Sequence, residues 1–273
     1  MKTHKGALRP YAAVTRVRLA TGLQYRAAAL GGVVTQFFWG ALEILAFAAL
    51  YQNGQPQPMS FAQLASYIWL QQAFLALLMP WFLDPDILEA IDQGALAYEM
   101  CRPLDLYALW FAKSGARRVS RTLLRCAPIL LVAALLPAPY GLMMPPSPLA
   151  AACFALSLCL SFLVVTALCM LLYAATCHTL SARGIRLVAV TITGFLAGEI
   201  VPLPFFPVWL QGLLAWLPFG AMQNMPLRVY SGNIAGAALA RGLALQVFWA
   251  AALTLAGHAL LARAQRHVQI QGG

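Results

Sequence analysis

Apolar segments of about 20 residues recur along this chain between residues 27 and 262. Bilayer hydrocarbon is roughly 30 Å thick, so a helix needs about 20 mainly apolar residues to cross it. Hydrophobic residues make up 62% of the sequence and charged residues only 10%, whereas about a quarter of a typical soluble domain is charged. A soluble fold cannot bury that much apolar surface. The sequence therefore predicts an all-α integral membrane protein, with residues 1–273 in a single transmembrane domain.

The apolar segments predict six transmembrane helices. Turn residues and prolines separate spans at residues 27–51, 61–83, 126–137, 149–173, 187–201 and 235–262, of which the third continues a longer helix with a basic start. Before the first span, residues 1–26 mix leucines with arginines, which favours a cytoplasmic interfacial helix. Prolines between the last two spans leave an apolar run of only about ten residues, too short to cross. We therefore expect an external re-entrant hairpin within residues 202–233.

The placement of the basic residues predicts the orientation. The formal net charge is +10, but the basic residues flank apolar segments instead of forming one patch, which argues against a nucleic-acid partner. With both termini in the cytoplasm, all 18 Lys and Arg residues except Arg228 and Arg241 lie on the cytoplasmic side. A seventh span at residues 207–218 would move Arg263 and Arg266 outside. The positive-inside rule therefore favours six spans.

The chain lacks the sequence patterns of familiar catalytic sites. There is no GxSxG, no HExxH and no pair of intramembrane aspartates, and the 4 histidines are scattered. The GxxxxGK[ST] loop that binds nucleotide phosphates is also missing from the sequence. We therefore expect a protein that is not an enzyme and that binds no metal and no cofactor. Any ATP that drives it must be hydrolysed by a partner.

Two segments of the sequence resemble a known transporter family. The first runs from Ile91 to Tyr107 and contains Gly94, Tyr98-Glu99 and Arg102-Pro103-Leu104-Asp105. The second contains Gly198-Glu199-Ile200-Val201-Pro202, followed by Leu217-Pro218-Phe219 and Met225-Pro226. Both segments are similar to parts of the ABC-2 family of ABC-transporter permeases.

This resemblance implies the permease subunit of an exporter, a multi-pass protein of a bacterial inner membrane. Such a half-transporter has six spans and pairs with a second permease subunit, identical or homologous, around a central path. Two cytoplasmic ABC ATPase subunits beneath it hold ATP and Mg. The first cytoplasmic loop of the permease carries a helix that couples it to the ATPase.

Residues 84–105 fit the position and chemistry of that coupling loop. Acidic residues dominate the segment, and Arg102 is its only base. An acidic segment is repelled by an anionic leaflet and left free to meet a protein. Asp84-Pro85 favours a helix start, with an apolar face after it. The residues expected to couple to the ATPase are Asp86, Ile87, Leu88, Glu89, Ile91, Asp92 and Gly94. The alternative is a solvated connector.

Carboxylates inside apolar segments predict a substrate path. Glu43 lies near the middle of the first span, where an ionised carboxylate costs on the order of 3 kcal/mol, so it should face protein or water. Gln36, Trp39, Glu43 and Phe47 share one helical face, and Glu199 is the second such acid. Rings beside a carboxylate suit a cationic or amphipathic cargo. The alternatives are an interhelical hydrogen bond, a protonated Glu43, or a secondary transporter or channel that uses both acids for ion coupling.

A basic stripe leads into the third span. Lys113, Arg117, Arg121 and Arg125 follow one another at four-residue intervals. Long basic side chains at a membrane boundary reach lipid phosphates and fix the topology. We therefore expect membrane lipids to be the partners of this stripe.

Overall fold

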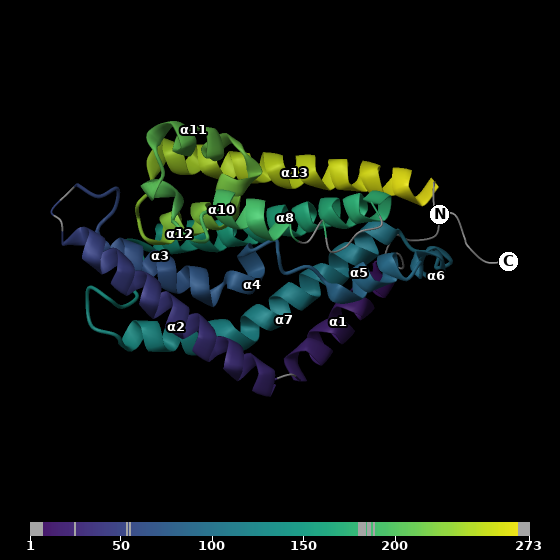
Figure 1. Cartoon of the computed structure of the whole chain (residues 1–273), viewed down its shortest axis with the longest axis horizontal. Coiled ribbons are helices and arrows are strands. Elements are labelled where there is room, and N and C mark those ends of the chain that lie inside the picture. The colour runs from purple at the N-terminus through teal and green to yellow at the C-terminus, as the bar shows by residue number, and fades with distance from the viewer. Residues whose placement is uncertain are drawn as a thin grey trace.

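The computed structural model describes residues 8–24, 26–52, 54, 56–179, 184, 187 and 189–266. Within these residues every regular element is a helix, and none is a strand. The expected cytoplasmic termini, residues 1–7 and 267–273, lie outside the described part, as do Arg183 and Arg186. Figure 1 shows the long helices α2, α7, α8 and α13 forming the body of the molecule, with α5 and α6 at the end where α8 and α13 finish.

Three helices are long and apolar enough to cross a membrane. They are Ala29–Tyr51 within α2 (Arg26–Tyr51), α8 (Pro148–Thr179) and α13 (Gly236–Arg266). α8 and α13 lie side by side along the molecule (Figure 1). These helices correspond to the first, fourth and sixth expected spans, and they indicate a helical membrane protein. Six crossings stay a prediction.

The second expected span, residues 61–83, differs from the prediction because it is broken. Ser60 caps α3 (Phe61–Ala73), since its hydroxyl accepts a hydrogen bond from the Gln63 amide and the Gln63 side chain accepts one from the Ser60 amide. The helix breaks at Phe74, and α4 (Leu75–Leu78) ends two residues before Pro80. Met79 is extended (φ −99°, ψ 126°), as residues before proline usually are.

The third expected span lies in one long helix with a basic first half, as predicted. α7 (Leu106–Leu135) begins at Asp105, whose carboxylate accepts a hydrogen bond from the Ala108 amide at 2.7 Å, and it continues through Pro128. α1 (Arg9–Gln24) packs along α7 and makes an angle with α2 (Figure 1). The expected N-terminal helix is therefore present over its described residues, and its place at a lipid interface stays a prediction.

The fifth expected span, residues 187–201, is not a continuous helix in the residues described. The chain turns at Gly198, which has a φ of +79°, and a Cβ there would lie 2.3 Å from Cδ1 of Leu203. The apolar run between Pro207 and Pro218 forms a short helix, α11 (Val208–Trp216), and the expected external re-entrant hairpin stays a prediction. The elements of this region are η2 (Ala189–Thr193), α10 (Gly194–Leu196), η3 (Leu203–Phe205), α11 (Val208–Trp216), η4 (Gly220–Asn224) and α12 (Met225–Tyr230).

Polar side chains of α8 and α13 satisfy the backbone of this broken region. The Ser161 hydroxyl donates to the Met222 carbonyl at 2.7 Å, and Nε2 of Gln246 donates to the Ala221 carbonyl at 2.9 Å. Met222 itself has non-helical geometry. Where no water is at hand, every freed backbone group needs such a partner. The segment is therefore fixed to α8 and α13 through buried hydrogen bonds.

Candidate functional site

α5 (Pro85–Asp92) forms where the sequence predicted a helix start. The Asp84 carboxylate accepts a hydrogen bond from the Asp86 amide at 3.0 Å, and Pro85 takes the first helical position, where its missing N–H costs nothing. The Asp84 amide in turn donates to the Tyr173 hydroxyl of α8 at 2.6 Å. Gly94, at a φ of +70°, separates α5 from α6 (Leu96–Met100). The start of α5 is therefore tied to the body of the protein.

The inner face of α5 is covered by the protein itself. Ile87, Leu88 and Ile91 are buried and pack in the core with Leu109 of α7 and Tyr173 of α8. Ile87 has no exposed surface, and Leu88 and Ile91 are only 9% and 5% exposed. These three residues anchor α5 in the core, and their part in coupling stays a prediction.

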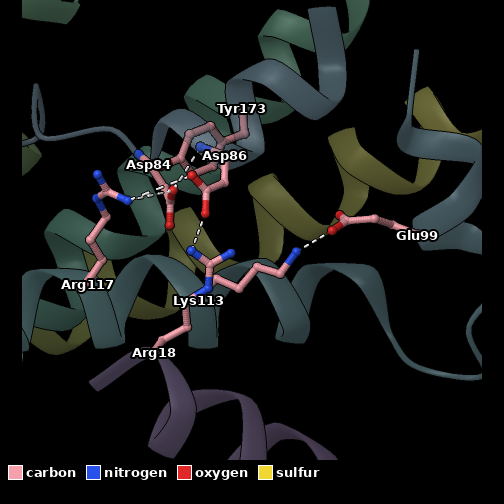
Figure 2. A network of polar contacts seen from close by, with 7 residues as sticks. All are labelled: Arg18, Asp84, Asp86, Glu99, Lys113, Arg117 and Tyr173. Carbon is pink, nitrogen blue, oxygen red and sulfur yellow. Dashed lines mark hydrogen bonds and ion pairs between the residues drawn. The ribbon is translucent and has the colours of Figure 1, made fainter. Parts of the chain in front are cut away.

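Ion pairs connect α5 and α6 to α1 and α7 (Figure 2). Arg18 of α1 donates to Asp86, and Arg117 of α7 lies 3.4 Å from the Asp84 carboxylate. Lys113 of α7 pairs with Glu99 of α6. Acidic side chains of the protein therefore pair with Lys113 and Arg117, and lipid binding by the basic stripe stays a prediction.

The same network sets the charge state of Asp86. Partial burial raises its pKa, but the hydrogen bond from Arg18 and the charges of Arg18, Arg117 and Lys113 outweigh that effect. The pKa of Asp86 is therefore below its ordinary value. The Asp86 carboxylate is ionised at neutral pH and holds α5 against α1.

The outer face of α5 and α6 forms an exposed surface that we call the α5–α6 surface, made of Glu89, Asp92, Gly94, Tyr98 and Met100. Tyr98 is 81% exposed, which is high for an aromatic residue in a helix. Among the residues described, neither Glu89 nor Asp92 forms an ion pair. The surface therefore combines free negative charge with an uncovered aromatic ring.

A cavity of about 710 Å³ lies between α2, α3 and the turn that contains Glu199. Its lining includes all the residues predicted for a substrate path, namely Gln36, Trp39, Glu43, Phe47 and Glu199. The cavity opens where Trp39 and Ile200 are 58% and 68% exposed. The structure thus brings together residues 156 positions apart in sequence (199 − 43), and their role in transport stays a prediction.

Hydrogen bonds fix Glu199 in the wall of this cavity. Nε1 of Trp81 donates to both carboxylate oxygens, at 3.1 and 3.0 Å, and Nε2 of Gln71 donates to the backbone carbonyl of Glu199 at 2.7 Å. The Gln72 side chain interacts with Glu43. The two carboxylates are therefore held by side chains that come from α3 and from the segment after α4.

The sequence prediction missed six polar or aromatic residues of the lining, namely Thr35, Gln71, Gln72, Trp81, Phe82 and Arg125. Two consecutive glutamines inside an apolar span were a usable signal, because amides in that setting face protein or water. Arg125 carried no such signal. Its guanidinium packs against Gly32 of α2 so closely that a Cβ there would lie 2.4 Å from Cζ of Arg125.

Comparison of the sequence with protein-family models gives no match, and neither does comparison with characterised proteins. The likeness to ABC-2 permeases therefore rests on the two sequence segments that carry it.

Proposed function

We propose that this chain is the permease subunit of an ATP-driven exporter and that a separate ABC ATPase docks on the α5–α6 surface. The carrying observation is the contrast between the two faces of α5. Its inner face is buried, whereas its outer face presents Glu89 and Asp92 without ion-pair partners in the described chain. A short helix with one buried face is held in place, and its exposed face can still bind a protein surface of positive or mixed charge.

The contacts of α5 also provide a route from the α5–α6 surface to the cavity. Asp84, Asp86 and Glu99 join the two short helices to α1 and α7. α7 reaches the cavity wall through Arg125. A displacement of α5 on ATP binding would therefore move a helix that lines the cavity. The support for this route is that α5, α7 and the cavity wall contact one another in sequence. Energetic coupling between α5 and the cavity has to be measured.

The proposed membrane arrangement has six crossings with the elements from η3 to α11 on the external side. It is supported by the apolar segments of the sequence and by the positive-inside rule, because all Lys and Arg residues except Arg228 and Arg241 then lie on the cytoplasmic side. The open side of the cavity, at Trp39 and Ile200, suits a half-transporter, because a second permease subunit would close it. The cargo path would then run between the two subunits.

Charge reversal on the outer face of α5 tests the docking proposal. We expect at least about tenfold less ATPase to co-purify with the double variant Glu89→Lys, Asp92→Lys than with the wild-type chain. The reversed charges would repel the docking surface of the ATPase instead of attracting it. Both side chains are exposed, so the variant should insert normally, as gel filtration of the solubilised protein will show. Glu89→Gln with Asp92→Asn should give an intermediate loss.

Gln52→Lys is the matched control, since it adds positive charge at an exposed site just after the end of α2, outside the α5–α6 surface. It should leave ATPase association unchanged. If the doubly reversed protein retains its ATPase, the α5–α6 surface is a connector and the docking proposal is wrong. Transport by the purified chain alone would instead favour the secondary transporter or channel.

A further inference from the structure

We infer that the cavity between α2 and α3 binds a protonated amine, an organic monocation that donates hydrogen bonds and carries an apolar body. The inference names a substrate class for the exporter, so its role in transport rests on the proposed function. Binding itself depends only on the residues of the cavity. It can therefore be measured on this chain without an ATPase.

Unpartnered acceptor atoms are the first observation. Oε1 of Gln36, Oε1 of Glu43 and Oε1 of Gln71 are buried and have no hydrogen-bond partner among the residues that the structure describes. Gln36 and Gln71 are only 5% and 1% exposed, and both line the cavity. A buried acceptor left without a donor costs about 1–3 kcal/mol. Nε2 of Gln71 is already used by the Glu199 carbonyl at 2.7 Å, so the free atom of its amide is the oxygen. The ligand has to supply donors.

The charge of the lining is the second observation. The cavity is lined by two acids, Glu43 and Glu199, and one base, Arg125. Each carboxylate disfavours ionisation of the other, and Arg125 can balance only one of the two negative charges. A monocation between them would supply the second positive charge and so favour the ionised form of both. An anion would meet two carboxylates, and a neutral ligand would supply no positive charge.

The size and the apolar walls of the cavity fit an organic ligand better than a bare metal ion. A volume of about 710 Å³ falls in the range of about 300–1,000 Å³ that is usual for small-molecule sites. Trp39, Phe47, Trp81 and Phe82 supply rings, and the rings of Trp81 and Phe82 stack at 3.9 Å. Ring faces attract a cation and pack against an apolar body. The walls therefore suit an amine with a hydrocarbon or aromatic portion.

The test uses the full chain in lipid nanodiscs and follows tryptophan fluorescence, since Trp39 and Trp81 line the cavity. The probe is 2-phenylethylammonium. We expect saturable binding, and at least about tenfold weaker binding of 2-phenylethanol, which has the same body without the charge. Trimethyl(2-phenylethyl)ammonium keeps the charge but has no N–H, and we expect it to bind at least about threefold more weakly than the probe. Equal binding of the alcohol and the ammonium probe overturns the inference.

Substitutions of the lining residues test whether the ammonium probe binds in the cavity. Glu43→Gln and Glu199→Gln should each weaken the ammonium probe at least about tenfold while leaving the alcohol unchanged, which also shows that the cavity is intact. Gln36→Leu should weaken the ammonium, whereas Gln52→Leu, an exposed amide beyond the end of α2, should not. Unchanged ammonium affinity in both glutamine variants overturns the inference.

The two proposals fail separately. If the ammonium probe does not bind but charge reversal on α5 still removes the ATPase, only the substrate class is wrong. If the probe binds as expected and no ATPase associates with the chain, the cavity inference stands and the exporter proposal is wrong.

Discussion

At the scale of single residues, Arg118 has a structural role that the sequence did not indicate. It is 1% exposed, and its guanidinium donates to the carbonyls of Ala76, Met79 and Phe82 at 3.1, 2.8 and 3.1 Å. These carbonyls lie at and just beyond the C-terminal end of α4, where the helix dipole favours positive charge. The positive-inside rule counted Arg118 as one more cytoplasmic base, because hydropathy cannot distinguish a base that satisfies a broken helix from one that faces water.

Replacing Arg118 should destabilise the protein strongly. Arg118→Met leaves several buried carbonyls unsatisfied at about 1–3 kcal/mol each, so we expect a loss of at least about 3 kcal/mol. The Tm in detergent should fall by roughly 6 °C or more. Arg118→Lys should lie between, because one ammonium cannot replace the planar guanidinium fork. Arg241→Met, at an exposed position of α13, is the control and should change stability by less than about 0.5 kcal/mol. Equal Tm values for the Arg118 and Arg241 variants would contradict this role.

At the scale of elements, the sequence predicted that α5 is a helix but not which of its faces is buried. The Asp84-Pro85 start and the apolar spacing predicted a helix, and the structure has one at Pro85–Asp92. Which face meets the protein was not predictable, because an apolar face fits a partner as well as the chain's own core. Contacts from residues far away in sequence decide it, such as Arg18 and Tyr173. The same limit explains α3 and α4, whose break depends on a partner in α7.

The ion pair between Arg18 and Asp86 predicts a specific pH response of α5. Because the pKa of Asp86 is lowered, its contribution is present above the unfolded pKa and is lost as pH falls through the folded pKa. Hydrogen exchange of α5 amides, corrected for intrinsic rates, should be constant from neutral pH down to the ordinary carboxyl range near about pH 4 and rise only below it.

Asp86→Asn removes the charge at every pH, so its α5 amides should exchange faster already at neutral pH. Asp92→Asn is the matched control, since Asp92 is exposed and has no ion-pair partner in the described chain, and it should behave like the wild type. Identical exchange in the Asp86 variant and the wild type would show that the ion pair does not hold α5.

At the scale of the whole molecule, hydropathy predicted the long helices and the helical membrane class. Ala29–Tyr51, α8 and α13 follow from apolar length alone. The region from η2 to α12 did not follow, because its path depends on buried partners such as Ser161 and Gln246, which a one-dimensional profile reads as ordinary residues of an apolar span. The cavity was only partly predictable from the sequence. Its α2 face was predictable from helical spacing, and the two consecutive glutamines of α3 were a usable signal, but the contribution of Arg125 was not predictable.

The central claim is that this chain works as a membrane subunit driven by a separate ATPase. Native mass spectrometry of the complex extracted from its own membrane tests this claim most directly. We expect the chain to appear with a second permease subunit and with two copies of a protein that carries a nucleotide-phosphate loop, and addition of ATP and Mg should add mass to that protein alone. A chain that is extracted without any nucleotide-binding partner, and that transports cargo by itself in liposomes, would contradict the account.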